Sequence, residues 1–264
     1  MSSLTDLTGR DYLSFSSLSS YADCGERFYW ERVKSVHTEK GWWLVAGTAF
    51  HLATEWLDEG RALTPNKAWH EAWTQTLAKE EETPTKTGGR ATKQWPNKET
   101  PDYYHFHAPV WLENYCKWRD DRLFAGWNWV SINDKPAIEV PVSGELGGVN
   151  VKGYIDRIMA SPDGEAHVID IKTSSRTPTS VQLDVYAQLI GDNYGIPVTY
   201  GSYYMARKGE ASEPKAMDMS TAALSNQFTM AKRGIEAEVF LPNVGMLCGT
   251  CGVRSHCSVF NRSE

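Results

Sequence analysis

Apolar residues recur with a helical period in the part of the chain before about residue 125. Residues 16–33 form the first such segment, and Ser16 or Ser17 can cap its start. Further helices are predicted over residues 45–58, about 67–79 and about 102–122.

The period then changes to the shorter one that is typical of strands. Four short segments are rich in Val and Ile and are separated by turn residues: WNWVSI, AIEVPV, VNVKGYIDRIMA and AHVIDIKT. SPDGE joins the last two as a hairpin turn, because Pro162 presets φ and Gly164 tolerates a positive φ. After these strands we expect a helix over residues 179–190, a strand at VTYGSYYMA and a helix over about 221–239.

Helices before and after a compact sheet predict an α/β fold. We expect a single domain over residues 1–264, with a helical part over about 1–125, a core over about 126–210, and a C-terminal helix with a cysteine-rich tail over about 211–264. Residues 82–100 are rich in Thr, Pro and Gly and carry basic side chains, including Arg90, so they are expected to form an exposed loop.

The composition, with 41% hydrophobic and 23% charged residues, is that of an ordinary soluble globular protein. A net charge of −6 gives no overall positive field, so a nucleic-acid partner would need a local basic surface or metal ions. The chain has no apolar stretch of about 20 residues and no basic start followed by an apolar run, so we expect no membrane association and a cytoplasmic location. It has no phosphate-binding G-x-x-x-x-G-K-[ST] motif, so we expect no need for ATP.

The hairpin carries two acidic residues and a lysine. Asp156 lies on its first strand, and Asp170 and Lys172 lie two positions apart on the second, so that the latter two face the same way. Such a group suits binding of Mg²⁺ or Mn²⁺ and hydrolysis of a phosphodiester. Glu139, on a neighbouring strand, is a weaker candidate within reach of the same place. Taken alone, the pattern also fits a surface hairpin with an Asp–Lys ion pair.

Five cysteines exclude a fully paired set of intramolecular disulfides. Cys248, Cys251 and Cys257 are closely spaced, and clustered cysteines in a reducing compartment indicate a metal site. Thiolates bind tetrahedral Zn²⁺ or an iron–sulfur cluster, and the spacing fits both. Cys116 has aromatic neighbours on a predicted helix and is expected to be a buried free thiol.

Six segments resemble, in the same order, the motifs of RecB-type nucleases of the PD-(D/E)XK superfamily. The resemblance is strongest to the iron–sulfur branch, which includes CRISPR-adaptation nucleases and stand-alone phage exonucleases. The segments are LSFSSLSSYADCGERFYW, GTAFH, GYIDRI, VIDIKT, QLDVY and CGTCGVRSHC. The resemblance covers essentially the whole chain and implies a restriction-endonuclease-like core sheet flanked by helices.

The resemblance also implies roles for individual residues. His51, Asp156 and Asp170 would bind the catalytic Mg²⁺ or Mn²⁺, with the carbonyl of Ile171 as a further ligand. Lys172 would be the catalytic lysine. A histidine that faces the core is the alternative for His51.

Further roles concern the surroundings of the site and the cysteines. Gln182 and Tyr186 would support the lysine or bind the DNA backbone, although a spacing of four residues also fits simple packing of a helix face. Arg27, on the first helix, is a candidate for binding the substrate. A 4Fe–4S cluster would join the N- and C-terminal segments through four cysteines: Cys24, Cys248, Cys251 and Cys257.

The resemblance therefore predicts a metal-dependent DNA exonuclease that acts on single-stranded DNA or DNA ends, with 5′→3′ polarity. The alternatives are a structure-specific or CRISPR-adaptation-type endonuclease, and a non-catalytic DNA-binding adaptor with the same fold. The presence of Asp156, Asp170 and Lys172 together argues against the adaptor, since a binding protein does not need them.

Overall fold

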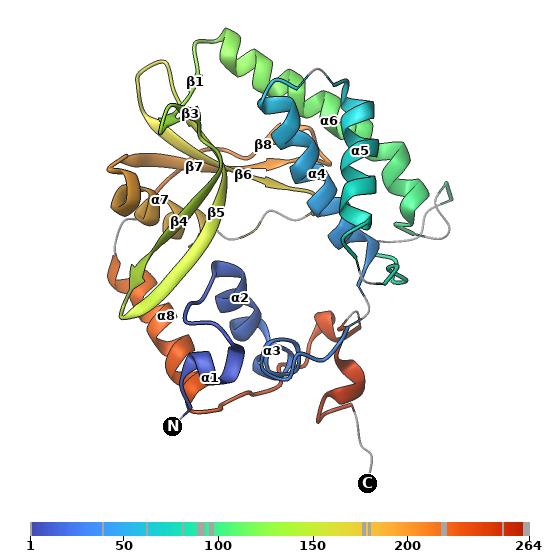
Figure 1. Ribbon diagram of the computed structural model, residues 1–264, viewed down its shortest axis with the longest axis vertical. Coiled ribbons are helices and arrows are strands. Elements are labelled where there is room, and N and C mark those ends of the chain that lie inside the picture. Colours follow the sequence, from blue (N-terminus) through green and yellow to red (C-terminus); the bar gives the residue numbers. More distant parts are fainter. Residues whose placement is uncertain are drawn as a thin grey trace. The chain divides into compact units, whose positions relative to one another are not determined.

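A computed structural model of the protein (Figure 1) describes residues 2–38, 40–61, 63–80, 82–88, 93–94, 98–175, 178, 181–217, 221–249 and 251–260. Arg90 and the first two residues of the helix predicted over 179–190 lie outside the described residues. The chain forms two compact units. The first consists of Met1–Glu39, Pro141–Gly153 and Met219–Glu264, and the second of Lys40–Val140 and Tyr154–Asp218. The single domain expected from the sequence stays a prediction.

Three helices of the second unit occupy the segments that predicted them: α4 (Trp42–Asp58), α5 (Pro65–Leu77) and α6 (Pro101–Phe124). Pro65 and Pro101 begin their helices at positions where a missing N–H costs no helical hydrogen bond. Buried alanines on α4 and α5, such as Ala49 and Ala68, give the helices small surfaces for close packing. Across the described part of the chain, no helix has both the length and the apolar character needed to cross a membrane.

The main sheet has the strand order β1-β5-β6-β7-β8, with β4 paired to β5 and β9 paired to β7. Its strands are β1 (Asn128–Trp129), β4 (Ile138–Leu146), β5 (Val149–Ala160), β6 (Ala166–Lys172), β7 (Val198–Met205), β8 (Glu210–Ala211) and β9 (Lys215–Ala216). A separate pair is formed by β2 (Ser131–Ile132) and β3 (Lys135–Pro136).

The connections of the sheet confirm the predicted α/β class. β5 and β6 are antiparallel, and Gly164 in the turn between them has a φ of 84°, as the hairpin prediction requires. β6 and β7 are parallel, and the chain passes between them through α7 (Val181–Tyr194). The sheet is therefore mixed, and helices flank it (Figure 1).

The first unit contains α1 (Leu4–Thr8), α2 (Phe15–Asp23), α3 (Gly25–Phe28), a π-helical turn (Tyr29–Val33), α8 (Thr221–Glu236) and two 3₁₀ turns (Met246–Gly249 and Arg254–His256). The prediction of one unbroken helix over residues 16–33 is wrong, because Cys24 has an extended backbone, with φ −165° and ψ 108°, and separates α2 from α3. Gly25 then lies against the backbone of Leu241, so closely that a Cβ would come within 3.0 Å of it. The break thus places Cys24 beside the C-terminal segment.

Candidate active site

The β5–β6 hairpin brings together the three charged residues that the sequence singled out. The antiparallel register sets Asp156 and Asp170 at the same level of the two strands. Asp156 Oδ2 accepts a hydrogen bond from the backbone N–H of Ile171 over 2.6 Å, and Lys172 Nζ lies 2.6 Å from Asp170 Oδ2. Both carboxylates are buried. The hairpin therefore holds two carboxylates and an ammonium group at one end of a buried strand pair.

His51 and Glu139 extend this group. His51 projects from α4 and places its Nδ1 3.5 Å from Asp156 Oδ1. Glu139, on β4, has a φ of 49°, a backbone conformation that is uncommon outside Gly and that recurs at functional sites. One ligand atom from each of His51, Glu139 and Asp156 lies within 4.8 Å of the other two. The structure thus joins Glu139, the weaker candidate, to two of the three side chains expected to bind metal, and Asp170 is not among the residues whose atoms converge.

Gln182 and Tyr186 lie one turn apart on α7 and meet the same group. Gln182 donates hydrogen bonds from Nε2 to Asp170 Oδ1, over 3.0 Å, and to the hydroxyl of Tyr186, over 2.8 Å. Tyr186 is buried. Gln182 thus contacts Asp170, and Tyr186 contacts Gln182. The roles of both residues in catalysis or in binding DNA stay predictions.

The charges of the group influence one another strongly. Burial and the neighbouring charge of Asp156 raise the pKa of Asp170 to about 7, although Lys172 acts in the opposite direction. Burial and Asp156 also raise the pKa of Glu139. Burial acts to raise the pKa of Asp156 as well, but His51 and the N–H of Ile171 bring that pKa below its usual value. Three carboxylates that share a buried site repel one another, and a bound cation would relieve this repulsion.

The donor atoms fit a divalent metal ion. Three ligand atoms already converge within 4.8 Å, and the buried carboxylate of Asp170 belongs to the same group of charges, with its Oδ2 paired to Lys172 over 2.6 Å. Carboxylate oxygens and an imidazole nitrogen are a donor set that Mg²⁺ and Mn²⁺ accept. The contact described for Ile171 involves its N–H, and the expected ligation by its carbonyl stays a prediction.

Arg157, which was not singled out from the sequence, contacts Glu139 and the backbone of Asp156. Its side chain is fully buried, and its Nε lies 2.5 Å from Asp58 Oδ2 on α4. Tyr115 of α6 donates a hydrogen bond to the same oxygen, and Arg119 lies 2.9 Å from Asp58 Oδ1. An arginine followed by three apolar residues of a strand, Ile158 to Ala160, was a signal that such a partner had to exist, because a buried charge requires one.

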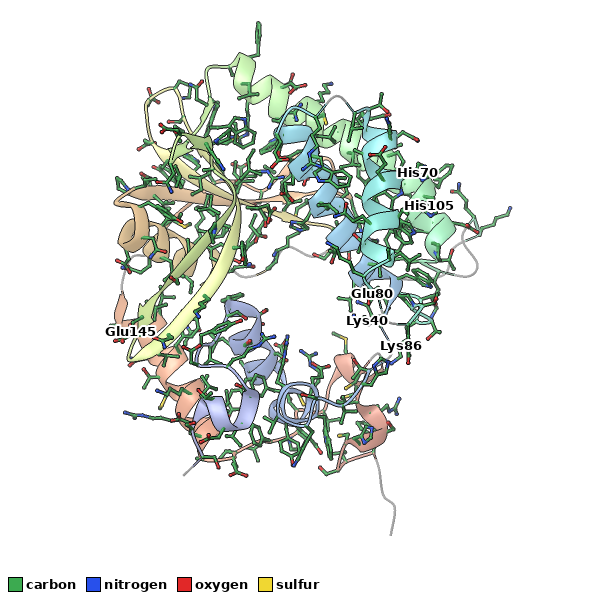
Figure 2. The ribbon with its side chains drawn as sticks, in the orientation of Figure 1. Lys40, His70, Glu80, Lys86, His105 and Glu145 are labelled. Carbon is green, nitrogen blue, oxygen red and sulfur yellow. The ribbon has the colours of Figure 1, made fainter. Side chains whose placement is uncertain are left out.

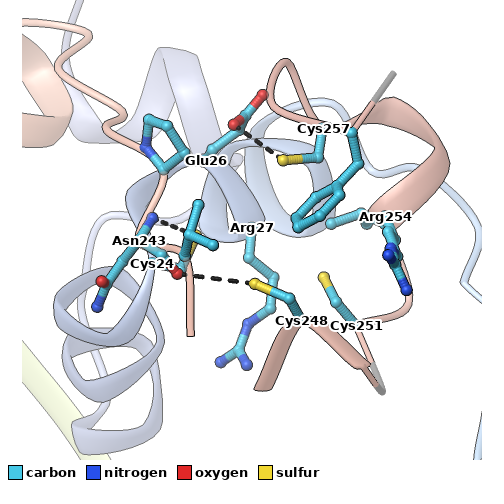
Figure 3. Close-up of a pocket in the computed structure, with 12 residues that line it drawn as sticks. Cys24, Glu26, Arg27, Asn243, Cys248, Cys251, Arg254 and Cys257 are labelled. Atoms are coloured by element: carbon cyan, nitrogen blue, oxygen red, sulfur yellow. Dashed lines mark hydrogen bonds between the residues drawn. The ribbon is translucent and has the colours of Figure 1, made fainter. Parts of the chain in front are cut away.

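Four of the five cysteines line one pocket of the first unit (Figure 3): Cys24, Cys248, Cys251 and Cys257. Backbone N–H groups of Asn243 and Gly245 lie 3.4 and 3.3 Å from the sulfurs of Cys24 and Cys248. Among the described residues, no three cysteine sulfurs lie within 4.8 Å of one another. The four cysteines thus line the same pocket without converging on one point, and the iron–sulfur cluster stays a prediction.

Two further residues singled out in the sequence, Arg27 and Cys116, lie in different units of the chain. Arg27 also lines the cysteine pocket, and its Nη2 lies 3.3 Å from Ser20 Oγ and 3.9 Å from Asp23 Oδ2. Its expected contact with the substrate stays a prediction. Cys116 is on α6, in the second unit, where burial raises the pKa of its thiol to about 11.

Comparisons with known proteins identify the family of the chain. Residues 12–258 match the PD-(D/E)XK nuclease superfamily. The chain is 32% identical to the Gene 69 protein of Mycobacterium phage D29, over 94% of this chain and 96% of the relative, and 30% identical to that of Mycobacterium phage L5, with the same coverage. A solved structure from Eubacterium rectale, described as a candidate exonuclease, covers 96% of this chain and 88% of its own, with 11% identity and a TM-score of 0.48.

Proposed function

The chain belongs to the PD-(D/E)XK nuclease superfamily, and on that basis we propose that it is a metal-dependent DNA exonuclease that acts on single-stranded DNA or DNA ends. The observation that carries the proposal is the convergence of His51, Glu139 and Asp156 beside the Asp170–Lys172 ion pair. The 5′→3′ polarity rests on the resemblance of the ordered motifs to stand-alone phage exonucleases of the RecB type.

His51, Asp156 and Asp170 would hold Mg²⁺ or Mn²⁺, with Glu139 as an additional carboxylate. A bound ion of this kind polarises the phosphate and lowers the pKa of a water molecule. The imidazole of His51 makes the site more favourable for Mn²⁺ than one built of oxygen ligands alone.

Lys172 would neutralise the negative charge that develops during hydrolysis. Its ammonium group lies 2.6 Å from Asp170 and 5.8 Å from the centre of the Tyr203 ring, so the side chain is held from two sides. In the reaction, the oxygen of water forms a bond to phosphorus and the bond from phosphorus to the leaving oxygen breaks. The attacking water gives one proton to solvent, and the leaving oxygen takes one proton from solvent to become a hydroxyl. Negative charge grows on the phosphoryl oxygens as this occurs, and a fixed ammonium group stabilises it.

The four cysteines of the first-unit pocket are proposed to hold a 4Fe–4S cluster. Thiolates bind both tetrahedral zinc and iron–sulfur clusters, and four of them line this pocket. The resemblance of the ordered motifs to the iron–sulfur branch of the RecB-type nucleases supports the cluster. Such a cluster would tie Cys24 to the C-terminal segment and stabilise the first unit as a long-range cross-link.

The proposal is tested with the Lys172→Ala protein, Mn²⁺ and DNA labelled at either end. Wild-type protein should release short products from linear single strands from the 5′ end, leave circular single strands intact, and do so without ATP. Lys172→Ala should lose at least about 100-fold in rate, whereas Lys135→Ala, which removes an exposed lysine of β3, should not. Full activity of the Lys172→Ala protein would overturn the mechanism, and cutting of circles would indicate an endonuclease.

A further inference from the structure

We propose that Arg157 is a positioning residue that holds the metal-binding side chains of His51, Glu139 and Asp156 in their mutual arrangement. This inference rests on the proposed function, since it concerns the same metal site. Arg157 follows Asp156 on β5, so the two side chains point to opposite faces of the strand. The guanidinium therefore lies behind the site, where it is fully buried.

The guanidinium contacts Glu139 and Asp156 directly, and it reaches His51 through Thr54. Arg157 Nη1 lies 3.0 Å from Glu139 Oε1 and donates a hydrogen bond to the backbone carbonyl of Asp156 over 2.6 Å. Arg157 Nη2 donates to Thr54 Oγ1 over 3.1 Å, and Thr54 Oγ1 donates in turn to the carbonyl of His51 over 2.8 Å. One side chain is thus bonded to β4, β5 and α4, the three elements that supply the ligands.

The position requires arginine for a geometric reason. A guanidinium offers five N–H donors in a rigid plane, whereas an ammonium group is a compact point charge. Arg157 uses separate nitrogens for Asp58, Glu139 and Thr54. Lysine would retain the charge and lose the simultaneous contacts.

The contact with Glu139 has a direct consequence for metal binding. A carboxylate has two oxygens, and the ion pair with Arg157 engages one, Oε1, so the second remains for a cation. The pair also holds Glu139 in its left-handed backbone conformation, which few residues adopt without support. Without the guanidinium, the side chain of Glu139 would be less ordered. Metal binding would then have to order it, which would weaken the affinity for the metal.

Asp58 balances the charge of Arg157 and anchors it. Asp58 accepts from Arg157 and Tyr115 and forms an ion pair with Arg119, so both of its oxygens are engaged. Arg119 shares this anchor without contacting His51, Glu139 or Asp156 in any interaction described here. It therefore offers a matched control that disturbs the same buried carboxylate without touching the ligands.

The test is a Mn²⁺ titration, followed by the electron paramagnetic resonance signal of free Mn²⁺, on the full chain in three variants. Arg157→Lys should bind Mn²⁺ roughly 10–100-fold more weakly than wild type, the range typical for residues that orient metal ligands. Thr54→Val, which removes only the link to His51, should weaken binding several-fold. Arg119→Lys should lower the stability of the apoprotein in urea while its Mn²⁺ affinity stays within about twofold of wild type.

The outcomes separate this inference from the proposed function. If wild-type protein binds no Mn²⁺ and cleaves no DNA, the proposed function fails. If wild type binds and cleaves while folded Arg157→Lys binds Mn²⁺ equally well, Arg157 is a structural residue only. Should Arg157→Lys fail to fold, an unchanged Mn²⁺ affinity in Thr54→Val would overturn the positioning role by itself.

Discussion

Gln182 Nε2 donates a hydrogen bond to Asp170 Oδ1 over 3.0 Å, while Lys172 holds the other oxygen of the same carboxylate at 2.6 Å. Both oxygens of Asp170 therefore have a partner, and these two contacts fix the orientation of the carboxylate. Tyr186 shares the amide of Gln182 and keeps it directed at Asp170.

Replacing Gln182 by methionine should lower the nuclease rate about 10–100-fold, because Asp170, a proposed metal ligand, loses a group that orients it. Gln182→Met preserves length and removes the hydrogen bonds. Gln188→Met is the matched control: it lies on the same helix, and its amide bonds to Asp192 at the surface. Equal losses in the two variants, measured as kcat/KM on single-stranded DNA, would mean that the effect comes from α7 and not from Asp170.

Much of this site was predictable from the sequence, because Asp156, Asp170 and Lys172 follow from strand alternation and a hairpin turn. Glu139 was harder, since its place depends on a φ of 49° that no apolar pattern encodes. Arg157 could not be assigned, because its partners Asp58 and Thr54 are about 100 positions away in the sequence. The break at Cys24 was also hidden, since apolar residues continue at helical spacing on both sides of it.

Glu139→Gln should weaken Mn²⁺ binding roughly tenfold or more, because affinity for a hard cation depends on the number of charged oxygen ligands. The amide oxygen can still accept from Arg157, so the variant separates charge from position. Burial and Asp156 raise the pKa of Glu139, which means that its ionised form is unfavourable in the apoprotein. The unfolding free energy of the metal-free variant should therefore equal or exceed that of wild type in urea titrations. A destabilised variant with unchanged Mn²⁺ affinity would contradict the assignment of Glu139 as a ligand.

His105 should make the stability of the protein depend on pH through contacts remote from the site. Trp69, fully buried on α5, donates from Nε1 to His105 Nδ1 over 3.0 Å, and the ring of His70 stacks on His105 with centres 5.1 Å apart (Figure 2). Burial, followed by the charge of His70, lowers the pKa of His105, and Asp102 opposes this. Because the folded state disfavours the protonated ring, this contribution to stability is complete above about pH 6.5, the pKa of a histidine in the unfolded chain. It is lost as the pH falls from there through the lower pKa of His105 in the folded state.

The measurement compares urea unfolding at about pH 8 and about pH 5 in wild type and His105→Asn. Asparagine places an oxygen near the position of Nδ1, so it can accept from Trp69 without titrating. The loss of unfolding free energy on acidification should be smaller in the variant than in wild type. An equal or larger loss would assign the pH dependence to other groups.

Replacing Cys24 should remove bound iron, whereas replacing Cys116 should not. Cys24 lines the pocket with three other thiols, whereas Cys116 is half-buried on α6, where burial raises the pKa of its thiol to about 11 and so disfavours the thiolate that binds metals. Anaerobically purified wild type and Cys116→Ser should contain about four iron atoms and a broad visible absorption band. Cys24→Ser should lose most of both. It should also unfold at a lower urea concentration, because the proposed cluster would cross-link α3 to the C-terminal segment through Cys24. One equivalent of zinc and no iron in the wild-type protein would show that the site binds zinc and not a cluster. Loss of metal from Cys116→Ser would contradict the proposed set of four ligands.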